Sequence, residues 1–346
     1  MLKVGIAGIG FMGWIHWLAY QKVPGVSVVA ICEKDTKRLK GDWTDIQGNF
    51  GPPGEHVDLS EIATYQDLDE MVRDDSLDLI DICLPPSFHL MAIELAAQAG
   101  KRVFCEKPLA LNLQDCDLAN EACQRSGHDL QVGHVLPFFP EYAFARQEIA
   151  SGKYGALLGG HFKRVISDPT WLKDFYDPQK VGGPLIDLHI HDAHFIRLLF
   201  GMPCEVTSMG RMRDSVVSYC NSIFRFDNPE ICVSSNSGVI NQQGRPFTHG
   251  FEIHLEHATM HFEFAGFSDT GESMPLKIVT ADGEVIRPVL DNSDPLQGFI
   301  SEIEEVVHSI QNGQPSEILA GKLARDAIEL CQAQAESVQT GQPVQL

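Results

Sequence analysis

The strongest constraint on the fold is a regular alternation of short apolar runs with helical patterns over the first 133 residues. Runs rich in β-branched and apolar residues stand at 3–7, 26–32, 62–65, 79–84, 102–105 and 130–133. Helical patterns fill the intervals at 13–22, 67–73, 88–99 and 112–126, the last with Asn112 as its cap. Strands that alternate with helices form parallel sheets, because a parallel pair needs a crossover connection. Residues 1–133 are therefore predicted to form a doubly wound α/β domain of the Rossmann type.

The pattern changes after residue 137. We expect a helix at 141–151, a long strand at 156–166, an irregular stretch at 167–183 and a helix at 184–200. Between 204 and 289, extended runs follow one another with turn signals such as Asp282-Gly283 between them, which is typical of a mainly antiparallel sheet. Helices are expected at 295–312 and 316–339. Residues 134–346 are thus predicted to form an α+β domain for substrate binding and oligomerisation.

Charge and composition limit the partners. The formal net charge of −21 opposes binding to nucleic acid or to an anionic membrane, because both attract basic proteins. The nine cysteines include no CxxC pair, which favours a reducing compartment. The chain opens on a strand and contains no apolar run of about 18 residues, so we expect a cytoplasmic protein without a membrane span. A large sheet covered on one side only also predicts a homodimer or homotetramer.

A glycine motif follows the first predicted strand. Gly8, Gly10 and Gly13 form G-x-G-x-x-G at the start of a helix. Glycine permits the tight turn and lets the backbone approach a pyrophosphate, which the helix N-terminus attracts. Glu33 ends the second strand, where a carboxylate accepts hydrogen bonds from the adenosine ribose. The sequence predicts a dinucleotide site here, with further contacts expected from Phe11 and Met12.

The same carboxylate bears on the choice of cofactor. Glu33 would repel the 2′-phosphate of NADP, so NAD is the predicted cofactor and NADP the less favoured one. Lys34, Lys37 and Arg38 follow closely and offer positive charge to such a phosphate. The preference for NAD therefore depends on where these three side chains point.

Two further clusters carry a resemblance to a known family. The first is Leu-Pro-Pro-Ser-Phe-His at 84–89 together with Glu-Lys-Pro at 106–108, and the second is a glycine-rich segment with Asp-x-x-x-His at 182–191. With these motifs the chain resembles the Gfo/Idh/MocA family, which includes glucose-fructose oxidoreductase and inositol dehydrogenase. The resemblance extends over nearly the whole chain. It departs from the common family pattern at Pro137 and His194, where an Arg and an acidic residue are frequent.

The resemblance implies roles for particular residues. In the family, the Glu-Lys-Pro motif ends the fifth strand beside the nicotinamide, and its lysine contacts the reacting substrate hydroxyl. The matching lysine is Lys107. The cofactor contacts expected here are Lys107 itself and Leu84, Pro85, His89 and Glu106.

The second motif supplies a candidate base. In a helix that starts at Pro184, Asp187 and His191 lie one turn apart on the same face, where the carboxylate stabilises the imidazolium of a general base. The alternative is a buried structural histidine. Asp187, His189, His191, Asp192 and His194 also resemble a metal site, but His189 and His191 point about 200° apart on a helix and cannot both bind one ion. Asp187, His191 and His194 could, yet nothing else in the chain shows ligand spacing, so a metal site is disfavoured. We expect no metal.

These observations predict an NAD(H)-dependent oxidoreductase acting on a secondary hydroxyl of a sugar, polyol or related carbohydrate derivative. Lys107, Asp187 and His191 are the predicted catalytic residues and also contact the substrate. Further candidate substrate contacts, each with a structural role as the alternative, are His134, Arg164 and Trp171. Two other functions stay open: an NAD-retaining glycosidase or lyase that uses transient oxidation, and a regulatory protein that binds NAD without turnover.

Overall fold

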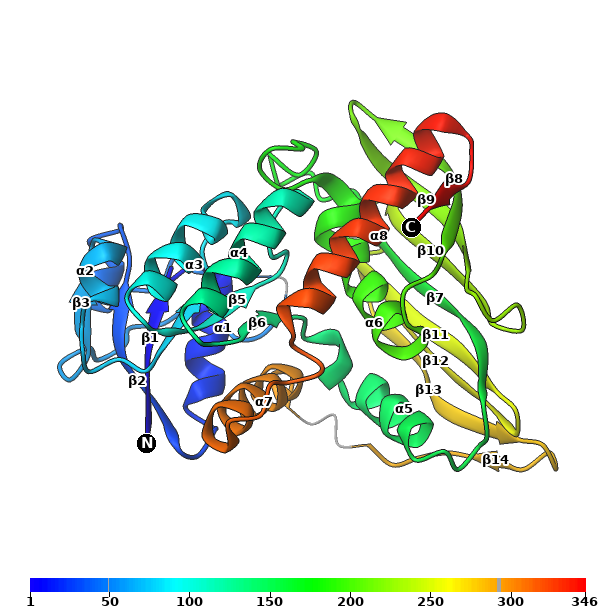
Figure 1. The fold of residues 1–346 in the computed structure, drawn as a ribbon, viewed down its shortest axis with the longest axis horizontal. Coiled ribbons are helices and arrows are strands. Elements are labelled where there is room, and N and C mark those ends of the chain that lie inside the picture. Colours follow the sequence, from blue (N-terminus) through cyan, green and yellow to red (C-terminus); the bar gives the residue numbers. More distant parts are fainter. Residues whose placement is uncertain (49, 291–293) are drawn as a thin grey trace. The chain divides into compact units, whose positions relative to one another are not determined.

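The computed structural model describes residues 1–48, 50–290 and 294–346, which form two compact units (Figure 1). The first unit comprises Met1–Phe138 and Asn292–Arg325, and the second comprises Phe139–Asp291 and Asp326–Leu346. The sequence placed the domain boundary at 133/134 and assigned everything after it to one domain. The chain instead returns to the first unit after the large sheet, because the helix at 297–312 packs there.

A six-stranded parallel sheet forms the centre of the first unit. Its order is β3-β2-β1-β4-β5-β6, and it confirms the predicted doubly wound fold. The strand bounds are β1 Leu2–Ala7, β2 Val26–Cys32, β3 Ala63–Tyr65, β4 Leu79–Ile82, β5 Arg102–Glu106 and β6 Leu130–Gly133. The order reverses between β1 and β4, so the carboxyl ends of these two strands flank the crevice where this fold binds ligands.

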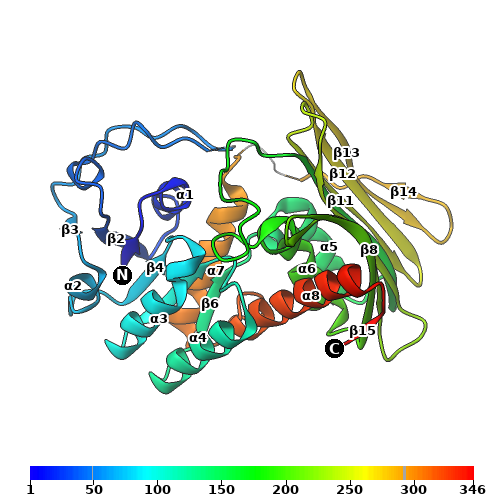
Figure 2. The same ribbon diagram turned by 90° about the horizontal axis from the view of Figure 1, so that it is seen from above.

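Helices cover both faces of that sheet. They are α1 Phe11–Tyr20, α2 Leu68–Val72, α3 His89–Gln98, α4 Leu113–Arg125 and α7 Gln297–Asn312, with short 3₁₀ turns η1 Arg38–Lys40, η2 Pro86–Phe88 and η3 Leu136–Phe138. In Figure 2, α3 and α4 lie on one face of the sheet and α1 with α7 on the other. The predicted cap of α4 is confirmed, because Asn112 Oδ1 accepts a hydrogen bond from the amide of Asp115 at 2.9 Å.

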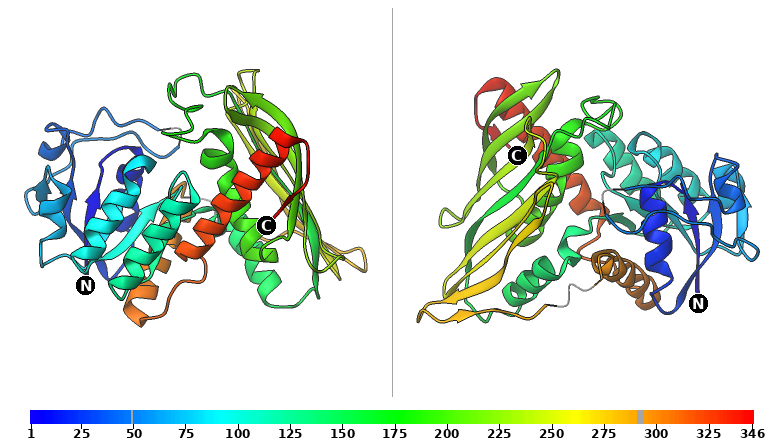
Figure 3. Two further views of the ribbon diagram at one scale, coloured as in Figure 1. Left: turned by 45° about the horizontal axis from the view of Figure 1, so that its top comes forward. Right: turned by 180° about the vertical axis from the view of Figure 1, so that it is seen from behind.

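A nine-stranded sheet dominates the second unit (Figure 3). Its order is β14-β13-β12-β11-β7-β10-β9-β8-β15, and every pair is antiparallel except β7 with β10. The strands are β7 Leu157–Ser167, β8 Glu205–Arg213, β9 Val216–Arg225, β10 Cys232–Ile240, β11 Phe247–Leu255, β12 Ala258–Gly266, β13 Gly271–Thr280, β14 Val285–Ile286 and β15 Val344–Gln345. This confirms the predicted large, mainly antiparallel sheet.

Helices cover one face of the large sheet. They are α5 Pro140–Ala150, a π-helical segment η4 Leu185–His189, α6 Ile190–Phe200 and α8 Gly321–Thr340, whose first turn belongs to the first unit. Aromatic rings fill the space between helices and sheet: Tyr142 of α5 makes edge contacts with Phe251 and Phe262, and Phe195 of α6 with Phe162. Alternation along each strand then directs the other side chains outward.

The outward face of the large sheet is polar at its centre. Lys163 and Glu263 form an ion pair there at 2.9 Å. Exposed apolar side chains lie on neighbouring strands of the same sheet, with Met209 on β8, Ile223 on β9 and Val279 on β13. The outward face therefore combines a polar centre with exposed apolar side chains on β8, β9 and β13.

Two further expectations concern the whole chain. The nine cysteines, all within described parts of the chain, are free thiols. Among the described helices, none combines the length and the apolar character needed to cross a bilayer.

Candidate functional site

The glycine turn between β1 and α1 has the form that a dinucleotide requires. Gly8 has a φ of +94°, and a Cβ atom on Gly13 would lie 2.0 Å from the carbonyl oxygen of Gly8. A Cβ atom on Gly10 would meet no atom within 4 Å, so the turn is open on that side. Gly10 caps α1 without a side chain, which leaves the helix N-terminus for an anion. These residues fit the pyrophosphate of a dinucleotide.

Glu33 is held beside this turn. Its Oε2 accepts a hydrogen bond from the amide of Ile9 at 2.9 Å, and its Oε1 accepts one from the amide of Lys34 at 2.6 Å. The carboxylate therefore links the end of β2 to the glycine turn. Oε1 also accepts a hydrogen bond from the amide of Asp35 at 3.1 Å, so Oε2, with one backbone donor, is the oxygen that keeps a lone pair for a ribose hydroxyl.

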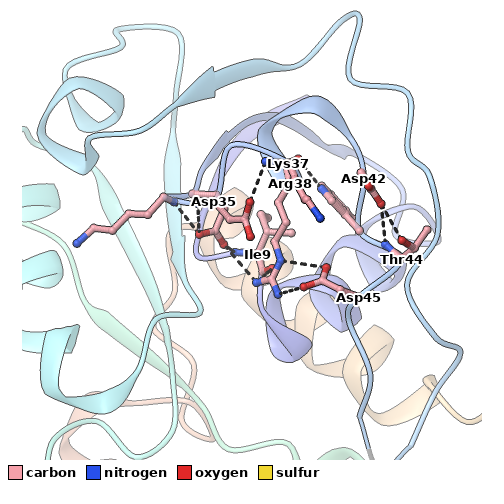
Figure 4. A network of polar contacts seen from close by, with 10 residues as sticks. Ile9, Asp35, Lys37, Arg38, Asp42, Thr44 and Asp45 are labelled. Carbon is pink, nitrogen blue, oxygen red and sulfur yellow. Dashed lines mark hydrogen bonds and ion pairs between the residues drawn. The ribbon is translucent and has the colours of Figure 1, made fainter.

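Arg38 joins the same network, which Figure 4 draws. Its Nη1 donates a hydrogen bond to the carbonyl oxygen of Ile9 at 2.9 Å and lies 3.8 Å from Glu33 Oε2. Its Nη2 donates to Oδ2 of Asp45 at 2.8 Å. The sequence singled out Arg38 as one of three nearby cations, but it gave no sign of the pairing with Asp45.

His89 holds the loop after β4 in place. The imidazole is buried, with Nε2 2.7 Å from the carbonyl oxygen of Leu84 and Nδ1 2.9 Å from that of Pro108. Burial lowers the pKa of this imidazole, and the two carbonyls oppose that effect. His89 therefore joins the Leu84-Pro85 loop to the Glu-Lys-Pro segment. A direct contact of His89 with the cofactor stays a prediction.

Glu106 positions the backbone of Lys107. Glu106 is buried at the end of β5, and its Oε2 accepts a hydrogen bond from the amide of Lys107 at 3.0 Å. Its Oε1 lies 3.0 Å from Nε2 of His16 on α1. Lys107 is half-buried and precedes a cis peptide bond to Pro108. It stands at the carboxyl end of a central parallel strand, where ligands bind in this fold.

His16 belongs to a buried polar group that sequence reasoning missed. Its Nδ1 lies 2.8 Å from Asp81 Oδ2 and 3.4 Å from Sγ of Cys83. Burial alone would lower the pKa of His16, but the carboxylate of Asp81 outweighs it and the pKa is raised well above its usual value. One signal was present in the sequence: Asp81 is a lone acid inside an apolar strand, which requires a buried partner.

Asp187 and His191 lie on a helix that differs from the one predicted. The expected regular helix at 184–200 contains the π-helical segment η4, a feature that occurs often at functional sites. Asp187 and His191 are half-buried, whereas the three residues between them are buried. The two side chains therefore share the less covered side of this segment. Lys107 belongs to the first unit and these two to the second, and their joint action stays a prediction.

The other candidate substrate contacts have different surroundings. Arg164 is buried and pairs with Asp192 through Nε at 2.7 Å and Nη2 at 3.1 Å, so its guanidinium already has an internal partner. His134 is buried directly after β6. Trp171 is 62% exposed in the loop after β7. The roles of these three side chains in substrate binding stay predictions.

The residues at 187–194 do not gather as metal ligands. Within the described parts of the chain, the His, Cys and carboxylate groups close enough to hold one ion are those of His16, Asp81 and Cys83. These three already contact one another. The thiol of Cys83 has a raised pKa because of burial, which disfavours the thiolate that metals bind.

Comparison with known proteins decides the family. Residues 2–134 match the description "Oxidoreductase family, NAD-binding Rossmann fold" of Gfo/Idh/MocA proteins, and residues 142–261 match the C-terminal domain of the same family. The chain belongs to the Gfo/Idh/MocA family. NAD is accordingly the cofactor of its first unit, as the glycine turn and Glu33 predicted.

Several Gfo/Idh/MocA relatives have described activities. The chain is 26% identical over 352 residues to scyllo-inositol 2-dehydrogenase (NAD(+)) of Bacillus subtilis, covering 100% of this chain and 96% of the relative. It is 36% identical over 211 residues to 2,7-anhydro-N-acetylneuraminate hydratase of Mediterraneibacter gnavus, covering 59% of this chain and 51% of the relative. An uncharacterized oxidoreductase of Streptococcus pneumoniae is 31% identical over 61% of this chain. The chain spans about half the length of the latter two.

Solved structures share the fold of this Gfo/Idh/MocA protein. Levoglucosan dehydrogenase in complex with NADH and levoglucosan superposes with a TM-score of 0.79 at 20% identity, over 99% of both chains. Scyllo-inositol dehydrogenase from Lactobacillus casei, with NAD(H) and scyllo-inositol, gives a TM-score of 0.74 at 22% identity, over 100% of this chain and 99% of the other. At these identities the likeness describes the fold.

Proposed function

We propose that the protein is an NAD(H)-dependent oxidoreductase acting on a secondary hydroxyl of a sugar, polyol or related carbohydrate derivative. The observation that carries this proposal is the position of Lys107. Glu106 anchors its backbone at the carboxyl end of β5, in the same parallel sheet whose β1 leads into the glycine turn. A relative that the chain covers from end to end is an inositol dehydrogenase, which supports a polyhydroxylated substrate.

The chain's own residues divide the chemistry as follows. NAD, which the glycine turn and Glu33 would hold, would supply the acceptor for the hydride from the carbon that bears the hydroxyl. His191 takes the hydroxyl proton as general base, and Asp187 orients the imidazole and stabilises its positive charge. Lys107 stabilises the negative charge that develops on the substrate oxygen. His134, Arg164 and Trp171 are proposed to contribute to substrate binding.

A substrate screen tests this function. The purified protein is incubated with NAD and a panel of inositols, aldoses, anhydrosugars and sugar acids, and NADH is read by absorbance. Net NADH formation with at least one panel member is the expected result. Retained cofactor with substrate conversion but no net NADH would replace this proposal with the alternative below.

The NAD-retaining alternative has one specific observation in its favour. The hydratase relative acts on a 2,7-anhydro sugar and is 36% identical over 211 residues. Transient oxidation with NAD retained differs from net oxidation in its cofactor balance, so tightly bound NAD that survives gel filtration is its signature. The third reading, NAD binding without turnover, is disfavoured because Lys107 and His191 are both present.

Location and assembly belong to the same proposal. The free thiols are consistent with a reducing compartment, and we propose the cytoplasm. We also propose a homodimer or homotetramer formed through the outward face of the nine-stranded sheet, with Met209 and Ile223 in the interface.

A further inference from the structure

Two of the three cations that follow Glu33, Lys34 and Arg38, occupy different positions. The ammonium of Lys34 lies over the ring of Phe88, 5.7 Å from its centre. The guanidinium of Arg38 instead turns toward the glycine turn and lies 3.8 Å from the carboxylate of Glu33. The guanidinium of Arg38 therefore lies beside the carboxylate that meets the adenosine ribose in this fold.

Asp45 neutralises this cation. Its two oxygens face two nitrogens of the guanidinium, with Nη2 to Oδ2 at 2.8 Å and Nε to Oδ1 at 3.4 Å. The third nitrogen of Arg38 donates to the carbonyl oxygen of Ile9. All three nitrogens thus have an acceptor within the protein (Figure 4). The fork geometry is the one in which guanidinium and carboxylate attract each other most strongly.

The loop that carries Asp45 is anchored. The buried indole of Trp43 donates a hydrogen bond from Nε1 to the carbonyl oxygen of Arg38 at 2.7 Å, and its ring packs edge-on against Trp14 and Trp17 of α1. Asp45 therefore stands two residues after the anchored Trp43, although the side chain of Asp45 is itself 60% exposed. The position of its carboxylate is set by the α1 packing and by Arg38 together.

We propose that Asp45 is a specificity-determining residue for the dinucleotide, which withholds the guanidinium of Arg38 from a 2′-phosphate. A 2′-phosphate would face two carboxylates, Glu33 and Asp45, and one guanidinium. A 2′-hydroxyl brings no charge and needs only a lone pair on Oε2 of Glu33. The pair formed by Arg38 and Asp45 thereby favours NAD without touching the part of the cofactor that NAD and NADP share.

The test is Asp45→Asn, which keeps an acceptor for Arg38 and removes the charge. Isothermal titration with NADP at low salt should show binding tighter by about two- to five-fold, the upper part of the range expected for a partly exposed ion pair. NAD affinity should change less than about two-fold. Asp42→Asn is the matched control, because Asp42 lies on the same loop and hydrogen-bonds Thr44 instead of Arg38. This control should leave both affinities near the native values.

A double variant keeps the proposal falsifiable. Arg38→Gln combined with Asp45→Asn should abolish the gain in NADP affinity, and 500 mM salt should reduce that gain by screening. Equal effects of Asp45→Asn and Asp42→Asn on the affinity for NADP would overturn the proposal. An Asp45→Asn variant that binds NAD and NADP equally more weakly would also overturn it. The inference rests on dinucleotide binding by the first unit, whose failure would appear separately as absence of NAD binding to the native protein.

Discussion

The imidazole of His16 lies 3.0 Å from the carboxylate of Glu106, and Glu106 directly precedes Lys107 in the chain. On the other side of the ring, Nδ1 of His16 lies 2.8 Å from Oδ2 of Asp81. A single buried ring thus connects α1, β4 and β5. Because Glu106 also accepts a hydrogen bond from the amide of Lys107, the buried His16 helps to fix the backbone of the proposed catalytic lysine.

His16→Gln should destabilise the first unit in a pH-dependent manner. The pKa of His16 is raised in the folded state, so its contribution is complete below the unfolded pKa of ~6.5 and is lost as the pH rises through the folded pKa. Loss of one partner from a buried ion pair costs about 3 to 5 kcal/mol. Urea unfolding at pH 6 and pH 9 measures this, and His56→Gln on the surface serves as control. A loss of unfolding free energy, relative to the native protein, that is larger at pH 9 than at pH 6 would contradict the assignment.

Lys107→Ala and His191→Ala should each slow hydride transfer while cofactor affinity stays nearly native. Removal of a general base such as His191 typically costs about a hundred- to ten-thousand-fold in rate, or roughly 3 to 5 kcal/mol. Removal of a charge-stabilising group such as Lys107 costs about a hundred- to thousand-fold. Single-turnover NADH formation on a substrate from the screen is the measurement. The controls are Lys180→Ala and His56→Ala, both exposed. Native turnover in both active-site variants would place the chemistry elsewhere.

Glu33→Ala should narrow the difference in affinity between NAD and NADP. The substitution removes the ribose acceptor and the repulsion toward a 2′-phosphate, and it also deprives the amide of Ile9 of its partner. Loss of a hydrogen bond to a charged group costs about 1.5 to 3 kcal/mol, so NAD binding should weaken about tenfold or more. Titration of both cofactors checks this against Glu61→Ala, an exposed carboxylate of the same unit. Tighter binding of NADP than NAD by the native protein would contradict the prediction.

Ile223→Glu should lower the molar mass in solution. Ile223 is 62% exposed on β9, and a charge there would disrupt a sheet-to-sheet interface between copies. Light scattering at micromolar concentration should give a dimer or tetramer for the native protein and a smaller species for the variant. Val289→Glu, which changes an exposed apolar residue outside the strands, should have no effect. A monomeric native protein would rule out this assembly.

Local pattern determined much of the fold. The alternation of strands and helices, the glycine turn and the Asn112 cap act between residues close in sequence, where spacing and stereochemistry suffice for a prediction. Glu33 was predictable for the same reason, since it ends the second strand of a unit with known geometry. The family and the NAD cofactor followed from these motifs.

Tertiary structure decided the relationships between distant residues. The bond between His16 and Glu106 spans 90 positions, and the helix at 297–312 packs on α1 although the large sheet intervenes in the chain. The pairing of Arg38 with Asp45 is nearer in sequence, yet it depends on Trp43 packing against α1. Hydrophobic periodicity specifies which residues are buried, but it does not specify the partner of a buried or half-buried charge. That choice arises only when packing brings a donor and an acceptor within hydrogen-bonding distance and excludes water from them.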